Sequence, residues 1–279
     1  MSLSTVLFLF LAHLGVGIVV TLLFVSREAG VKFFRFNAGL ASILLVIAFA
    51  FYGQALRAAA GPATGALHVS AAPSVVPLMT CTALIVLAWA TIGRALTRFR
   101  TAILAGAAAS GVSAVFLQAL ELSRSAPNTP AALMAASFVT SSLLLGGACT
   151  AMILGHWYLV IPSMNVAHLQ SIVKVHIASM IARVLVVALA IAFALAAFRP
   201  DLDAGPSFRR YMFSIDGVFF WQRVLFGLAG PAVLSYLTWQ TAKIRSTQSA
   251  TGILYVDFFT VVVGEVLAKY IVLATRVPV

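Results

Sequence analysis

Long apolar runs constrain this chain more than any other feature of its sequence. Apolar residues make up 62% of the chain and charged residues only 9%. A hydrocarbon core about 30 Å thick is crossed by about 20 apolar residues in a helix, so each run of that length is a candidate membrane span. We expect about eight spans, over residues 4–25, 38–57, 75–96, 101–121, 131–159, 169–197, 214–240 and 250–274.

Helices are the expected form of these spans. Lipid offers no partner to backbone N–H and C=O groups, so a span is either a helix or part of a closed barrel. Barrel strands alternate apolar and polar residues, whereas the run 42–51 is apolar almost throughout. The sequence therefore predicts an all-α, polytopic transmembrane bundle with short loops, and a single integral-membrane domain over residues 1–279.

Basic residues predict how the chain sits in the cell membrane. The net charge of +11 is spread beside span ends instead of forming one patch, which excludes nucleic acid as the expected partner and favours the lipid bilayer. Nine basic residues fall on one side: Arg27, Lys32, Arg35, Arg94, Arg98, Arg100, Lys174, Lys243 and Arg245. Six fall on the other: Arg57, Arg124, Arg199, Arg209, Arg210 and Arg276. The richer side should face the cytoplasm, which places both termini outside.

Ionisable residues inside the spans are the first candidates for function, because a charge in lipid needs a partner, a cavity or a pathway. Counted at helical rise, Arg183 and Glu265 lie about 21 and 22 Å above the inner end of their spans, and Arg223 lies about 14 Å below the outer end. These three can meet in the outer half of the bundle, as a structural ion pair or as a proton or ion pathway. Lys269, near the end of its span, is expected to extend to the membrane surface.

Asp257 is a further pathway candidate and is expected to lie alone in the inner half of the last span. At helical rise it lies about 10 Å from the cytoplasmic end. Two interpretations stay open. It is either a point of proton entry or a buried carboxyl satisfied by neighbouring hydrogen-bond donors.

Two histidines within spans suggest a metal site. A b-type haem needs two imidazoles at matching depth on facing helices. His13 lies about 14 Å below the outer end of its span, and His176 about 11 Å above the inner end of its own, so the two depths approach each other near the membrane centre. The alternative is a pair of histidines that form hydrogen bonds and bind no metal.

The segment 155–165 combines aromatic and polar side chains where the fifth span leaves the membrane. A quinone needs an apolar channel for its tail and hydrogen-bonding groups for its two carbonyls. His156, Tyr158 and Asn165 offer those groups, and Trp157 offers a stacking surface. An aromatic belt followed by a proline stop is the alternative explanation.

These features favour one function and leave two others open. The sequence contains no recognised catalytic motif, so it identifies no catalytic residue and does not decide whether the chain is an enzyme. We expect an integral membrane subunit of an electron-transfer complex that handles quinone and protons, with haem b as a second candidate cofactor and other redox subunits as partners. A proton- or ion-coupled transporter of small solutes is one alternative, and a structural assembly subunit is the other.

Overall fold

A computed structural model describes residues 2–60, 72–93, 97–126, 129–161, 165–196 and 208–279, and every regular element in these ranges is helical. The all-α fold class is therefore confirmed. The α-helices are α1 (Leu3–Thr21), α2 (Gly30–Ala60), α3 (Val75–Thr91), α4 (Arg100–Ser123), α5 (Ala131–Val160), α6 (Ala167–Ala196), α7 (Phe208–Met212), α8 (Gly217–Val224), α9 (Gly230–Lys243) and α10 (Thr247–Thr275). Short 3-10 turns cover Leu22–Phe24, Arg27–Ala29 and Thr97–Phe99.

Seven helical segments of the described chain are long and apolar enough to cross a membrane, so the protein is a polytopic membrane protein. The predicted span 75–96 is the one that differs. Its helix α3 has 17 residues, about 26 Å at helical rise, and ends at Thr91. The backbone leaves the helix at Ile92, and Gly93 adopts a φ of +78°, a conformation that glycine accepts without steric cost.

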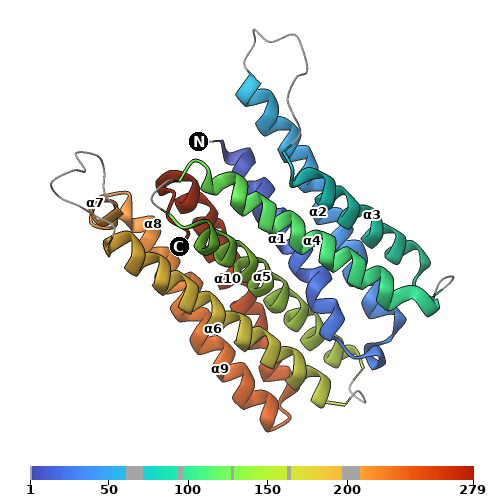
Figure 1. Ribbon diagram of the computed structural model, residues 1–279. Helices are drawn as coiled ribbons and strands as arrows, with labels where there is room; N and C mark the ends of the chain where they lie inside the picture. The colour runs from blue at the N-terminus through green and yellow to red at the C-terminus, as the bar shows by residue number, and fades with distance from the viewer. Residues whose placement is uncertain (1, 61–71, 94–96, 127–128, 162–164, 197–207) are drawn as a thin grey trace.

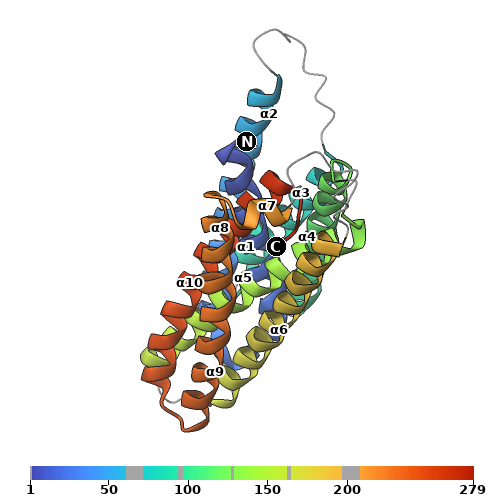
Figure 2. The same ribbon diagram turned by 90° about the vertical axis from the view of Figure 1, so that its left-hand side faces the viewer.

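The long helices lie side by side and alternate in direction, so the start of α1 and the end of α10 lie at the same end of the bundle (Figures 1 and 2). We call this end, which holds Leu3, Ser123 and Thr275, the terminal end. The opposite end holds the turns between α1 and α2 and between α9 and α10, together with the end of α5 and the start of α6.

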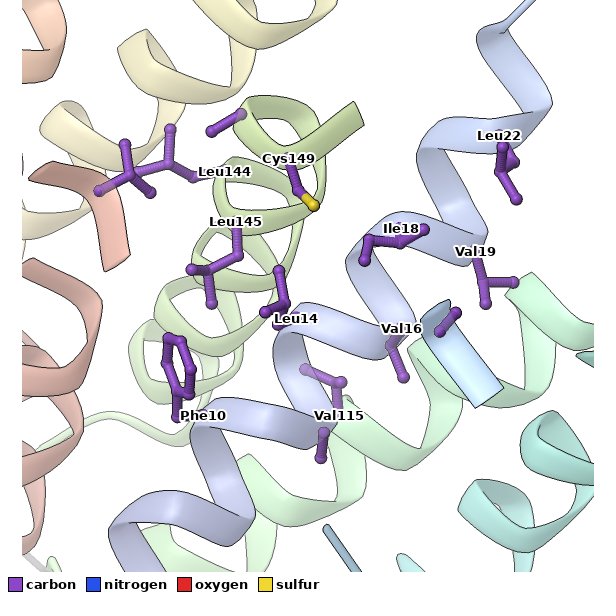
Figure 3. Close-up of a cluster of buried hydrophobic side chains, with 14 of the residues drawn as sticks. Phe10, Leu14, Val16, Ile18, Val19, Leu22, Val115, Leu144, Leu145 and Cys149 are labelled. Carbon is purple, nitrogen blue, oxygen red and sulfur yellow. The ribbon is translucent and has the colours of Figure 1, made fainter. Parts of the chain in front are cut away.

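The centre of the bundle is formed by α1 and α5. Their apolar side chains interdigitate with those of α4, as Figure 3 shows for Leu14, Val115 and Leu145. The two backbones touch at Gly17 and Gly146, where a Cβ built on Gly146 would lie 2.0 Å from the Gly17 carbonyl carbon. Small residues permit this approach, and close packing replaces the hydrophobic driving force that lipid cannot supply.

The seventh long helix is interrupted. Between α8 and α9, residues Leu225–Ala229 form a π-helical turn that ends just before Gly230 and Pro231. Proline has no N–H to donate to the carbonyl four residues earlier, which here belongs to Gly227. The guanidinium of Arg223 donates to that carbonyl instead, with Nη1 at 2.7 Å. π-Helical turns occur frequently at functional sites. The carbonyl freed in this one holds the charged side chain of Arg223 inside the bundle.

Candidate functional site

Four ionisable side chains from three helices meet in the half of the bundle nearer the terminal end. They are Arg183 on α6, Arg223 on α8, and Glu265 and Lys269 on α10, and we call them the charge cluster. All four are at most 2% exposed. Gly227 and Gly264 let α10 approach the π-helical turn, because a Cβ on Gly264 would lie 2.2 Å from the Gly227 Cα. That contact brings the carboxylate within reach of Arg223.

Glu265 is the centre of the charge cluster. Its Oε1 accepts from Arg183 Nε at 3.0 Å and from Arg223 Nη2 at 2.8 Å. Its Oε2 accepts from Ser141 Oγ at 2.5 Å and from Arg183 Nη2 at 3.3 Å. A carboxylate has about four lone-pair sites. The acceptor capacity of Glu265 is therefore filled by the protein itself.

Lys269 corrects an expectation from the sequence. It does not extend to the membrane surface, because its side chain is 2% exposed and its Nζ donates to Ser141 Oγ at 2.6 Å. Its Nζ also lies 3.9 Å from Glu265 Oε2 and 5.0 Å from the centre of the Phe138 ring. The structure thus brings together Arg183, Arg223 and Glu265, as expected, and adds a third cation that faces the same single carboxylate.

A second buried polar pair lies nearer the opposite end. His176 on α6 and Asp257 on α10 are both fully buried, with Nε2 and Oδ2 2.6 Å apart. Ser235 Oγ on α9 lies 3.1 Å from the same His176 nitrogen. The expectation that Asp257 lies alone was therefore wrong. His176 and Asp257 lie at nearly the same depth, because they are about 14 and 15 Å along α6 and α10 from the opposite end of the bundle.

An apolar groove of about 640 Å³ lies between α6 and α9, directly beside this pair. Ile181, Leu185 and Ala232, all exposed on the bundle surface, form part of its wall. Ser235, only 2% exposed, is the polar group of the groove that also contacts His176. The buried pair of His176 and Asp257 thus connects through the Ser235 hydroxyl to a cavity of about 640 Å³. Cavities that bind small molecules usually measure about 300–1,000 Å³.

Positive charge and an aromatic ring flank one end of the groove. Trp239 lines it, and the amines of Lys174 and Lys243 lie 5.3 and 5.1 Å from the centre of that ring. Amphipathic side chains of this kind collect at the boundary between hydrocarbon and water. The groove therefore runs from the boundary at the opposite end toward the apolar interior.

Of the four residues predicted to bind quinone, Tyr158 and Asn165 contact each other, whereas His156 and Trp157 contact separate neighbours. His156 Nδ1 lies 3.0 Å from the Tyr255 hydroxyl on α10, and the Trp157 ring packs edge-on against Phe33 of α2. The Tyr158 hydroxyl donates to the Asn165 carbonyl and accepts from the Leu169 N–H, which joins the end of α5 to the start of α6. These contacts tie helices together and place His156 against α10 and Trp157 against α2.

His13 and His176 do not fit a haem held between them, because α5 stands between the two side chains. His13 Nε2 contacts Gln118 Oε1 at 3.2 Å, and its ring packs against Phe138 of α5. His176 packs against Gly147, nine residues further along α5 and about 180° around its axis. Among the described residues, no three His, Cys, Asp or Glu side chains are placed to hold a metal ion.

Comparison with protein-family models, curated proteins and solved structures finds no match for this chain.

Proposed function

We propose that this polytopic membrane protein binds a quinone in the groove between α6 and α9 and exchanges protons with it through His176 and Asp257. The observation that carries the proposal is the contact of Ser235 with both the groove and His176. This contact of Ser235 joins the apolar groove, which opens to the side of the bundle, to the buried pair of His176 and Asp257, which we propose holds a proton. The binding position moves from the segment 155–165 to the groove.

The side chains around the groove match the two parts of a quinone. Its apolar wall accepts a tail dissolved in lipid, and the Ser235 hydroxyl either donates to a quinone carbonyl or accepts from a quinol hydroxyl. Behind that hydroxyl, His176 Nε2 and Asp257 Oδ2 accept and release the proton. Within the described residues, Asp257 Oδ1 has no hydrogen-bond partner, so the carboxyl has capacity to take one.

In the proposed reaction, electron transfer is carried out by the quinone and a partner subunit. A bound quinone supplies the redox chemistry, and a redox subunit of the same complex would exchange electrons with it. This chain then serves as the membrane subunit that positions the quinone head and moves its protons.

The charge cluster favours a structural role over a transport pathway. A transport site needs free capacity for its solute, whereas the four acceptor positions of Glu265 are taken by Arg183, Arg223 and Ser141. We therefore assign the charge cluster to holding α5, α6, α8 and α10 together.

Ala232→Phe is expected to weaken quinone binding by about tenfold or more, because the larger ring fills the groove. The full-length protein in lipid nanodiscs is titrated with decylubiquinone, and quenching of tryptophan fluorescence reports binding, since Trp239 lines the groove. Trp239→Phe identifies the component of the signal that arises there.

Val233→Phe is the matched control, because Val233 is 58% exposed, adjacent in sequence and outside the groove lining. Equal affinities of the Ala232→Phe and Val233→Phe proteins would sink the proposal, as would displacement of the quinone by excess phosphatidylglycerol. Asp257→Asn tests the polar end. It should weaken quinol binding more than quinone binding, because only the quinol must give its proton to an acceptor.

We also propose that the protein lies in the cell membrane with its terminal end outside. Cation–aromatic contacts at the opposite end support this orientation: Arg35 with Trp89, Arg100 with Phe34, and Lys174 and Lys243 with Trp239. In intact cells a membrane-impermeant maleimide should label Ser125→Cys and spare Ser249→Cys. Both positions are exposed, and the native cysteines are buried. The reverse labelling pattern would invert the orientation.

A further inference from the structure

A second cavity, of about 350 Å³, lies at the terminal end and is separate from the groove. Its lining comes from α1, α2, α4, α5 and α10 and from Arg276 just beyond α10, whereas the groove is built by α6 and α9. The aromatic rings of Phe8, Tyr52 and Phe138 form much of its wall, with the first two ring centres 5.1 Å apart. A wall of this kind suits a small, flat, apolar body.

Gln118 gives this cavity an unused hydrogen-bond donor. The residue is only 4% exposed, and its Oε1 is occupied by His13 Nε2 at 3.2 Å. Its Nε2 has no hydrogen-bond partner among the described residues. A buried amide N–H without a partner costs free energy that a bound acceptor would recover.

Arg276 is the second unused donor in the lining. Its backbone is held by Val272 and Thr129, but within the described chain its guanidinium makes no hydrogen bond and no ion pair. The acidic residue of the cavity is engaged: Glu121 accepts from the Ser74 N–H at 2.8 Å and from the Ser74 hydroxyl at 2.9 Å. The two groups of the lining without a partner among the described residues, Gln118 Nε2 and the Arg276 guanidinium, are donors, and the second carries a positive charge.

One member of the charge cluster, Lys269, contacts the ring of Phe138. Lys269 Nζ is 5.0 Å from the ring centre, and Phe138 itself lines the cavity. Three cations of the charge cluster share one carboxylate. In a weakly polarisable interior the positive charge beside this ring favours an anion over a cation in the cavity.

We infer that the cavity at the terminal end binds a small organic carboxylate with an apolar body. Arg276 and the Gln118 amide hold the carboxylate, and Phe8, Tyr52 and Phe138 enclose the body. The site is independent of the quinone groove and of the function proposed for it.

Three ligands with one shared body test this inference. The full chain in nanodiscs is dialysed against 3-phenylpropionate, its neutral amide and phenethylamine. The carboxylate should bind, the amide about tenfold more weakly, and the ammonium compound not measurably, because only the carboxylate uses both donors and the surrounding charge. Binding of phenethylamine as tight as that of the carboxylate, or no binding of the carboxylate at millimolar concentration, overturns the inference.

Two variants locate the site. Arg276→Met should lower the affinity for 3-phenylpropionate about tenfold, and Arg124→Met, an exposed arginine at the same end outside the lining, should leave it unchanged. Equal affinities of these two proteins would contradict the assignment. Ala232→Phe should also leave carboxylate binding intact, which separates a failure of this inference from a failure of the quinone proposal.

Discussion

Glu265→Gln is expected to lower the free energy of unfolding by about 3–5 kcal/mol, because three buried cations then lose the carboxylate that they share. The glutamine keeps the shape of the side chain and still accepts hydrogen bonds, so the loss reports charge and not a cavity. The measurement is thermal or denaturant unfolding of the purified protein in detergent, followed by tryptophan fluorescence.

A charge-compensated variant distinguishes this cause from a general loss of packing. Adding Lys269→Met to Glu265→Gln removes one of the unpaired cations and should recover part of the lost stability. Asp216→Asn, at an exposed position, should stay within about 0.5 kcal/mol of the unmodified chain. A Glu265→Gln protein as stable as the unmodified one would show that the charge cluster does not hold the helices together.

Gly146→Ala is expected to cost about 3 kcal/mol, although it adds a single methyl group. The new Cβ would lie 2.0 Å from the Gly17 carbonyl carbon and 2.1 Å from its oxygen, and neither backbone atom can move without its helix. Helices α1 and α5 must separate, which stretches the 2.6 Å contact between the Thr21 and Thr150 hydroxyls. The loss is measured by the same unfolding experiment.

Gly252→Ala provides the comparison, because a Cβ there meets nothing within 4 Å. Alanine favours a helix over glycine by about 0.5–1 kcal/mol, so this variant should be unchanged or slightly more stable. If both alanine variants unfold at the same temperature, the close approach of α1 and α5 does not contribute to stability as we argue.

The sequence predicts what depends on position along a helix. The depth of a residue in the membrane, calculated from the rise per residue, predicts that Arg183, Arg223 and Glu265 lie close together. The length of the apolar runs predicts the helices that carry these residues. Proline and glycine mark most of the ends. The end of α3 at Thr91 lies before the end of the predicted span, because the turn at Gly93 depends on a backbone conformation that the apolar run does not reveal.

Rotation about a helix axis is what the sequence could not supply. These spans are apolar on every face, so no amphipathic pattern shows which side meets a neighbour. For this reason depth alone predicts neither the contact of His176 with Asp257 nor the position of α5 between His13 and His176. Without this rotation, the sequence also does not predict that the Lys269 side chain points into the bundle, or that His156 and Trp157 contact different helices.

The groove between α6 and α9 opens sideways, beside residues such as Ile181 and Leu185 that are more than half exposed on the bundle surface. A guest that arrives from that direction never leaves the hydrocarbon phase. Its abundance is then counted per lipid molecule and not per litre of water. The occupancy of the groove will then depend on the composition of the surrounding bilayer. A hydrophobic compound that is scarce in water will still fill the groove if it is abundant in the bilayer.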